Sequence, residues 1–440
     1  YKNNLSFDLT NDQTRAIKEI RYDMATGKHM NRLLQGDVGS GKTIVAFMTS
    51  LIAIDNNYQA CLMAPTEILA IQHYKSIKKS SQNLNLNISL LTGSTKKKER
   101  EEINIELKNG NINLIVGTHT LIEEKIIFKN LGLAIIDEQH RFGVAQRSRL
   151  WKKNLIPPHI LIMSATPIPR TLSMTLYGDV DISSIKELPP GRKEIKTYLR
   201  NDSKRLNVFK FISSEIKKGR QIYIVYPLIE ESKKMDYKDL MDGFESISRY
   251  FPLPKYRISI VHGKMKSKDK DYEMERFVNG KTQIMVATTV IEVGVNVPNA
   301  SVILIESAER FGLSQLHQLR GRVGRGDHQS HCILMSSSQL SDDSKKRLNT
   351  MVEYSDGFKI ADVDLKLRGP GDVSGTKQSG LIKFKIVDIL GDQELIKITR
   401  ELAIDILNKD PELLNKNNLN LNRVYKSIYK GEKNIWNYIS

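Results

Sequence analysis

Apolar residues in this 440-residue chain fall in short, nearly uninterrupted runs, and longer stretches with apolar residues at helical spacing separate the runs. In the first part of the chain the runs are RLLQG (32–36), QACLMAP (59–65), NLIVGT (113–118), LGLAIID (131–137) and HILIMSAT (159–166). A strand that is covered on both faces is apolar throughout, so this alternation predicts βαβ units around a mostly parallel sheet.

A polar segment with two prolines and a glycine, KELPPGRKEIKT (186–197), interrupts the alternation. It predicts a linker, because these residues oppose the continuation of both helix and sheet. The pattern then restarts with RQIYIVYPL (220–228), RISIVHG (257–263), TQIMVATTV (282–290) and SVILIES (301–307). We therefore expect a first α/β domain over residues 1–188, a linker over 189–200 and a second α/β domain over 201–345.

The last part of the chain, residues 346–440, is more polar and less strand-like. Gly and Pro cluster in 367–380, and apolar residues recur at helical spacing from 392 onward, which predicts a loop followed by helices. The segment 419–440 interleaves aromatic residues with lysines. Nucleic-acid binders show this composition, but packing of an amphipathic helix on the preceding domains is the commoner reason for it, and we expect the packing.

The composition describes a folded, basic protein. Lys and Arg total 67 against 50 for Asp and Glu, a formal net charge of +17, which favours a polyanionic partner such as nucleic acid. Hydrophobic residues make up 40% of the chain, which excludes a disordered basic tail. Cys61 and Cys332 lie in apolar runs and are expected to be buried thiols. No apolar run is long enough to span a membrane, and we expect a cytoplasmic protein.

The segment RLLQGDVGSGKTIVAFMTSLIA contains the spacing G-x-x-x-x-G-K-T between a strand-like run and a helix-like one. This pattern is typical of a loop whose backbone N–H groups surround phosphates, with Lys42 on the β/γ-phosphate oxygens and the Thr43 hydroxyl on Mg²⁺. ATP or GTP binding follows. The residues predicted to hold the nucleotide here are Gly36, Asp37, Gly39, Ser40, Gly41, Lys42 and Thr43.

An acidic pair stands where hydrolysis requires it. Asp137 and Glu138 follow directly after the apolar run that ends at Ile136. At the carboxyl end of a strand, Asp137 is placed to bind Mg²⁺ and Glu138 to act as base on the attacking water. An acidic pair alone is usually a solvated turn, but the phosphate-binding loop upstream favours the catalytic interpretation.

The order of the motifs resembles that of superfamily-2 helicases and translocases: GDVGSGKT, then DEQH (137–140), SAT (164–166) and QLRGRVGRG (318–326). Further segments resemble the RecG family of bacterial fork-remodelling helicases, from about residue 6 to residue 405. They are MAPTEILAIQH, IIDEQHRFGVAQR, SATPIPRTL, ELPPGRK, HGKMK, TTVIEVGV, AERFGLSQLHQLRGRVGRG and DLKLRGPGDVSGTKQSG.

The resemblance implies two tandem RecA-like domains with parallel sheets, followed by a helical and loop element that drives translocation. It implies an ATP-dependent, Mg²⁺-requiring 3′–5′ motor on double-stranded and branched DNA, active in fork reversal and branch migration. A monomer at the bacterial nucleoid is implied, with a single-stranded-DNA-binding protein as a candidate partner. The family's N-terminal wedge domain has no counterpart in this sequence, and since the chain begins with Tyr1 we expect it to be part of a longer protein.

The resemblance also assigns roles around the nucleotide. Arg322 and Arg325 match arginine-finger positions, and guanidinium groups suit phosphate oxygens because they are planar and always charged. Two glutamines, Gln13 and Gln318, are implied in nucleotide binding, Gln13 through the adenine edge. The residues implied in relaying nucleotide state from the base are His140, Ser164 and Thr166.

The resemblance places the DNA contacts on the phosphate backbone, so binding without sequence preference is expected. The residues implied are Pro65, Thr66, Gln72 and Thr118 in the first domain and Thr288, Thr289 and Glu292 in the second. Asn296 replaces the Asp of many relatives, which removes any acidic role there. In the translocation element, residues 356–380, the polar positions are Arg368 and Gln378. Lys96 to Lys98 open a segment rich in Glu and are expected to be a solvated helix face.

Three alternatives share parts of this pattern. A motor like the transcription-repair coupling factor Mfd, which displaces a stalled polymerase, shares the motor and translocation motifs but needs a polymerase-binding domain. An ATP-gated DNA-binding scaffold would use the phosphate-binding loop as a switch. A small-molecule kinase would not require the second arginine-bearing domain.

Overall fold

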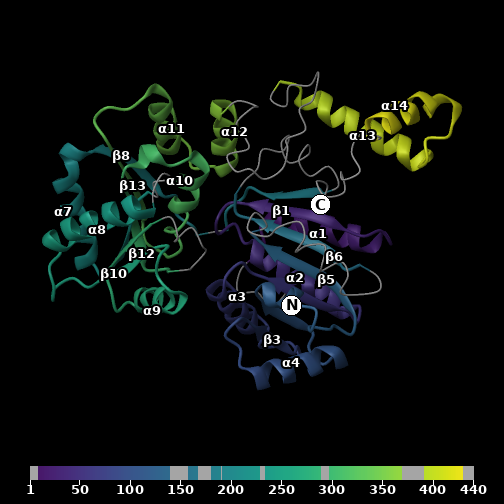
Figure 1. Ribbon diagram of the computed structural model, residues 1–440, viewed down its shortest axis with the longest axis horizontal. Coiled ribbons are helices and arrows are strands. Elements are labelled where there is room, and N and C mark those ends of the chain that lie inside the picture. The colour runs from purple at the N-terminus through teal and green to yellow at the C-terminus, as the bar shows by residue number, and fades with distance from the viewer. Residues whose placement is uncertain are drawn as a thin grey trace.

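Two separate parallel sheets organise the computed structural model, which describes residues 8–138, 157–166, 180–189, 191–227, 233–288, 297–368 and 391–429 (Figure 1). The first sheet consists of β1 (Asn31–Gly36), β2 (Gln59–Met63), β3 (Ile88–Leu91), β4 (Leu114–Gly117), β5 (Leu131–Asp137), β6 (His159–Ser164) and β7 (Asp181–Ile185). The second consists of β8 (Lys196–Asn201), β9 (Gln221–Val225), β10 (Ile258–Val261), β11 (Ile284–Ala287), β12 (Ala300–Ile305) and β13 (His331–Ser336).

The two sheets share one topology. The first has the order β3-β4-β2-β5-β6-β1-β7 and the second β10-β11-β9-β12-β13-β8, with parallel pairing throughout. With strands renumbered within each domain, both orders contain 3-4-2-5-6-1, and the first sheet adds β7 beside β1. This confirms the predicted pair of α/β domains.

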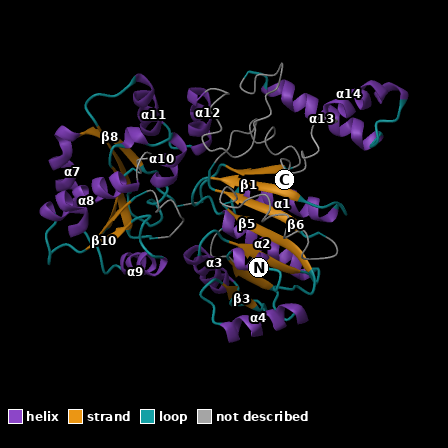
Figure 2. Cartoon of the chain, in the orientation of Figure 1, coloured by secondary structure: helices purple, strands orange, loops and turns teal. Residues whose placement is uncertain are grey.

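Helices cover both faces of each sheet (Figure 2). Those of the first domain are α1 (Asn11–Ala25), α2 (Lys42–Asp55), α3 (Glu67–Ser80) and α4 (Lys97–Asn109). In β2, Leu62 packs with the core on the α1–α3 side, while its neighbours Cys61 and Met63 pack with the core on the opposite side. The strand is therefore apolar without interruption because both of its faces are buried.

The second domain is covered in the same way. Its helices are α7 (Arg205–Lys217), α8 (Lys233–Tyr250), α9 (Ser267–Val278), α10 (Leu313–Arg320), α11 (Asp342–Glu353) and α12 (Gly357–Arg368). Leu348, Met351 and Ile360 of the last two helices belong to the second domain's core. The predicted boundary at residue 345 is therefore wrong, because it falls inside α11 and these buried side chains join α11 and α12 to this domain.

The linker prediction also needs correction. All of β8 except its last residue lies in the predicted linker, 189–200, yet the strand pairs with β13 from Lys196 to Asn201 at the edge of the second sheet. Its side chains are half-buried or exposed, so no apolar run marks the strand in the sequence. The connection between the sheets is thus shorter than predicted.

The C-terminal helices extend away from both sheets (Figure 1). α13 (Gln393–Lys409) confirms the helical spacing after residue 392, and α14 (Leu419–Tyr429) follows it. Leu421, Val424 and Tyr425 of α14 are about half exposed, so the expected packing of this helix on the motor is not seen in the described residues. Among those residues, no helix is both long and apolar enough to cross a membrane.

We predict that Leu62→Ala destabilises the first domain by about 2–5 kcal/mol, because the Leu62 side chain on the central strand β2 is fully buried in the core on the α1–α3 side and its loss leaves a cavity. Urea unfolding followed by circular dichroism measures the effect. Ile105→Ala is the control, because the Ile105 side chain is 59% exposed on α4. If the two variants lowered the urea midpoint of the first domain's unfolding by the same amount, the assigned core would be contradicted.

Candidate nucleotide site

The predicted phosphate-binding loop lies between β1 and the first turn of α2, as its sequence requires. Gly39 has φ 78° and Gly41 φ 87°, in the left-handed region that favours glycine. The backbone N–H of Ser40 donates to the carbonyl of Asp37 at 3.0 Å, which closes the turn. The strand, loop and helix therefore have the arrangement that exposes N–H groups to an anion at a helix N-terminus.

The ammonium group of Lys42 lies inside this loop. It donates to the carbonyl oxygens of Gly36 at 2.7 Å and Asp37 at 2.9 Å. Burial lowers the pKa of Lys42, while the carboxylates of Glu138, Asp137 and Asp37 act in the opposite direction. A bound phosphate would replace carbonyl oxygens with charged oxygens as the partners of this cation.

Gln13 connects α1 to the loop. Its Nε2 donates to the carbonyl of Ser40 at 2.8 Å, while its Oε1 accepts from the N–H of Thr10 at 3.0 Å. The Thr10 hydroxyl in turn accepts from the N–H of Gln13 at 3.2 Å, a reciprocal cap at the start of α1. Gln13 thus supports the loop backbone, and its contact with adenine stays a prediction.

The acidic pair stands beside the loop, at the end of β5. Oδ2 of Asp137 lies 2.8 Å from Nε2 of His73, a buried side chain of α3. Sequence reasoning missed His73. The feature that could have pointed to it is its position at the end of the RecG-like segment MAPTEILAIQH, directly after Gln72. The contact fixes the orientation of the carboxylate that was predicted to bind Mg²⁺.

Glu138 has the properties of a proton acceptor. Burial and, second to it, the charge of Asp137 raise its pKa to about 7, against the opposing charges of Lys42 and Arg322. Its Oε1 accepts from the N–H of Ala165 at 3.3 Å. A carboxyl group with a pKa near neutrality is suited to general base catalysis.

The loop after β6 joins Glu138 to the predicted relay residues. The hydroxyl groups of Ser164 and Thr166 lie 2.8 Å apart, on either side of the Ala165 N–H that contacts Glu138. This geometry links the SAT segment directly to Glu138, whereas His140 lies outside the described residues.

The second domain presents its arginines to this site. Arg322 is buried, its Nε donates to the carbonyl of Gln318 at 3.2 Å, and its charge acts on Glu138 in the first domain. For Arg325, burial and the like charges of Arg322 and Arg192 lower the pKa to about 9. The arginines crowd one another beside the phosphate-binding loop, an arrangement that a polyanion stabilises.

Arg192, in the connection between the sheets, was not predicted as a functional residue. Its Nη1 donates to the carbonyl of Val38 in the phosphate-binding loop, and its Nε donates to the carbonyl of Gly324 at 3.1 Å. One side chain therefore joins the loop to the arginine motif of the second domain. In the sequence this arginine lies in the segment ELPPGRK, which resembles the RecG family but carries no sign of either contact.

The remaining predicted residues are distributed as follows. Thr66 caps α3, accepting from the N–H of Leu69 at 3.4 Å, and Pro65 and Gln72 are half-buried. The hydroxyl of Thr118 is buried against that of Thr120, and Thr288 is buried at the end of β11. Thr43 and Gln318 are half-buried, and Arg368 ends α12. The predictions for His140, Thr289, Glu292, Asn296 and Gln378 fall outside the described residues.

Three family models match consecutive parts of the chain. Residues 10–175 match the DEAD/DEAH box helicase family, and residues 203–327 match the helicase conserved C-terminal domain. Residues 354–440 match domain 3, C-terminal, of ATP-dependent DNA helicase RecG. The first match lies within the first sheet domain and the second within the second sheet domain.

Curated relatives named ATP-dependent DNA helicase RecG are similar over nearly the whole chain. The Synechocystis protein is 49% identical over 97% of this chain and 51% of its own length. The Aquifex aeolicus protein is 50% identical over 94% of this chain and 53% of its own length. The chain thus spans about half the length of the curated relatives it matches.

Solved structures agree with the fold. A RecG structure bound to a three-way DNA junction superposes with a TM-score of 0.77 at 44% identity, over 90% of this chain and 51% of that chain. Yeast Dbp5 bound to RNA and ADP BeF3 has a TM-score of 0.52 at 15% identity, over 90% of this chain and 97% of that chain, which shows the fold alone.

We predict that Glu138 makes stability depend on pH. The native state keeps a proton on this carboxyl up to about pH 7, whereas the unfolded chain releases it near pH 4.5. Between these values a rise in pH favours the unfolded chain, so the free energy of unfolding falls. Glu138→Gln removes this cost, which is on the order of 1–3 kcal/mol. Its melting temperature should exceed that of the parent at pH 8 and approach it at pH 5.

The control for this measurement is Glu101→Gln, at an exposed position of α4. The melting temperature of this control should differ from that of the parent by the same amount at pH 5 and at pH 8. A Glu138→Gln variant that behaves like this control would contradict the raised pKa.

Proposed function

Because this chain belongs to the RecG family of ATP-dependent DNA helicases, we propose that it forms the ATP-driven motor of a double-stranded DNA translocase that remodels branched DNA. Fork reversal and Holliday junction branch migration are the proposed reactions. The observation that carries the proposal is the position of Arg322: a buried arginine of the second domain acts on Glu138 beside the phosphate-binding loop of the first. Hydrolysis then requires both domains.

In the proposed mechanism the loop N–H groups and Lys42 bind the ATP phosphates. Thr43 and Asp137 supply the oxygen ligands that Mg²⁺ prefers, and His73 supports this fit because it holds the Asp137 carboxylate in one orientation. Mg²⁺ bound there would neutralise phosphate charge. Glu138 accepts a proton from the attacking water, and Arg322 and Arg325 stabilise the charge that develops on the phosphate oxygens.

The partner we propose is DNA, bound through its phosphate backbone. The net charge of +17 supports a polyanion. The solved RecG relative is described as bound to a three-way DNA junction, and we extend this class of branched DNA to the present chain. We further propose that the protein acts as a monomer at the bacterial nucleoid, with a single-stranded-DNA-binding protein as partner.

Two observations separate the alternatives. The match of residues 354–440 to a RecG domain favours this assignment over a polymerase-displacing motor. The second sheet domain with its buried arginines does not fit a small-molecule kinase. An ATP-gated scaffold differs from a motor in turnover, so the rate of hydrolysis decides between these two.

We predict that duplex DNA stimulates the steady-state ATPase of this chain, and that a model fork stimulates it at least as much. The measurement compares no DNA, single strands, linear duplex and a fork at saturating ATP. A rate that none of these DNAs changes would contradict the motor and favour the ATP-gated scaffold.

A companion variant tests the shared site. Arg322→Ala should reduce the DNA-stimulated kcat about 10³-fold, because an arginine that stabilises transition-state charge contributes on this order. Arg249→Ala is the matched control, since that side chain is 81% exposed on α8. Parent-rate hydrolysis by Arg322→Ala would remove this residue from the mechanism.

A further inference from the structure

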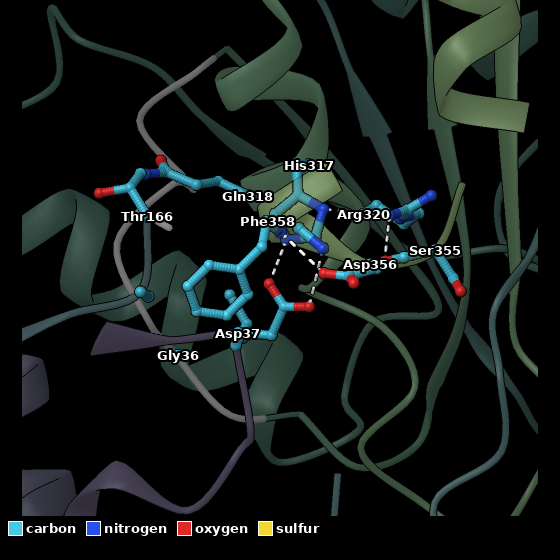
Figure 3. Close-up of polar contacts among 12 residues, drawn as sticks. Gly36, Asp37, Thr166, His317, Gln318, Arg320, Ser355, Asp356 and Phe358 are labelled. Carbon is cyan, nitrogen blue, oxygen red and sulfur yellow. Dashed lines mark hydrogen bonds and ion pairs between the residues drawn. The ribbon is translucent and has the colours of Figure 1, made fainter. Parts of the chain in front are cut away.

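The side chain of Asp37 leaves the phosphate-binding loop and points toward the second domain (Figure 3). Its Oδ1 lies 2.5 Å from Nε2 of His317 on α10, and its Oδ2 accepts from the backbone N–H of Gly357, the first residue of α12, at 3.1 Å. We call this set of contacts, made by Asp37, His317 and Gly357, the Asp37 bridge. It joins the loop to two helices of the other domain.

The hydrogen-bond partners of His317 determine which of its ring nitrogens donates and which accepts. Arg320 is a donor only, and its Nη2 lies 3.0 Å from Nδ1 of His317, so Nδ1 accepts and the hydrogen of a neutral ring is on Nε2, facing Asp37. Burial acts to raise the pKa of Asp37, but His317, the Gly357 N–H and Lys42 hold it below its usual value. The bridge therefore contains an ionised carboxylate and two donors.

The far side of the bridge is rigidly attached. Arg320 donates to the carbonyls of Met351 at 3.0 Å, Tyr354 at 2.9 Å and Ser355 at 2.8 Å, where α11 ends and the chain turns into α12 (Figure 3). Asp356 then caps α12 by accepting from the N–H of Phe358 at 2.8 Å. A displacement of Asp37 would therefore act on the start of α12.

The Asp37 bridge leaves no room for a side chain at position 357 unless Asp37 and His317 move. A Cβ added there would collide with Oδ1 of Asp37 and with Nε2 of His317. The contact therefore depends on the absence of a side chain at position 357. A larger residue there would disturb the Asp37 bridge and would leave the loop backbone, Lys42 and the acidic pair untouched.

Asp37 is also the residue through which nucleotide would act on the bridge. Its carbonyl accepts from Lys42, the cation that bound phosphate would draw away. The phosphates would also repel the Asp37 carboxylate toward its donors in the second domain. We propose that Asp37 is a positioning residue that transmits the occupancy of the phosphate-binding loop to α12, which begins the proposed translocation element. This inference rests on the proposed function.

The first experiment replaces Gly357 in the full 440-residue chain. Gly357→Ala should reduce the ratio of duplex-stimulated to basal kcat at least about fivefold, a typical size for coupling between sites, while KM for ATP changes less than about twofold. Ser355→Ala is the matched control, because its exposed side chain is removed while the carbonyl that binds Arg320 remains. An unchanged ratio in Gly357→Ala would overturn the inference.

The second experiment does not require DNA or turnover. Hydrogen–deuterium exchange of the Gly357 amide is measured with and without a saturating non-hydrolysable ATP analogue and Mg²⁺. We expect bound nucleotide to slow this exchange about fivefold or more, and Asp37→Ala to abolish the slowing, whereas Asp55→Ala, at an exposed position at the end of α2, retains it.

The two experiments fail in different ways. A parent chain whose ATPase ignores DNA contradicts the proposed function, and the exchange measurement then decides the bridge by itself. Equal slowing of exchange in the parent and in Asp37→Ala overturns the bridge and leaves the motor assignment intact.

Discussion

A buried lysine ammonium sets the arrangement of the whole site. A charge removed from water is costly unless partners surround it, and Lys42 finds carbonyl oxygens of its own loop at 2.7 and 2.9 Å and carboxylates at the ends of β1 and β5. Two strands that are not adjacent in the sheet must therefore end at the same depth. Burial, with the charge of Asp137 beside it, raises the pKa of Glu138 to about 7 although Lys42 opposes the rise, so the burial that confines Lys42 also suits Glu138 to accept a proton.

The second domain adds an excess of positive charge to the site. Burial and two neighbouring guanidinium groups lower the pKa of Arg325 to about 9, which means that its charge is held at a cost in free energy. A triphosphate between the domains would provide the negative charge that these arginines lack and would also draw Lys42 from its carbonyl partners. The free energy of binding the triphosphate could then hold the two domains together. This is expected of a motor in which domain closure precedes hydrolysis.

Much of the fold could be predicted from the sequence, for a physical reason. Strands such as β2 and β5 are buried on both faces, so each appears as an apolar run. The edge strands β3, β7 and β8 are partly exposed and give no such run, so the sequence predicts a linker where β8 lies. The phosphate-binding loop and the acidic pair are local patterns and were found. His73 and the Asp37 bridge were not, because their contacts join residues 64 and 280 positions apart.

Two residues at the tip of the loop, Asp37 and Val38, explain why it contacts the second domain so directly. Asp37 contacts His317 and Gly357, the carbonyl of Val38 accepts from Arg192, and the Val38 side chain lies where a Cβ on Gly321 would come within 2.7 Å of it. Each partner belongs to a different segment of the chain: α10, the start of α12, the connection between the sheets and the arginine motif. Close packing makes such a junction bistable rather than elastic, since a shift of a few tenths of an ångström breaks or makes several contacts together. A loop that moves when phosphate enters therefore acts on all four segments in one step.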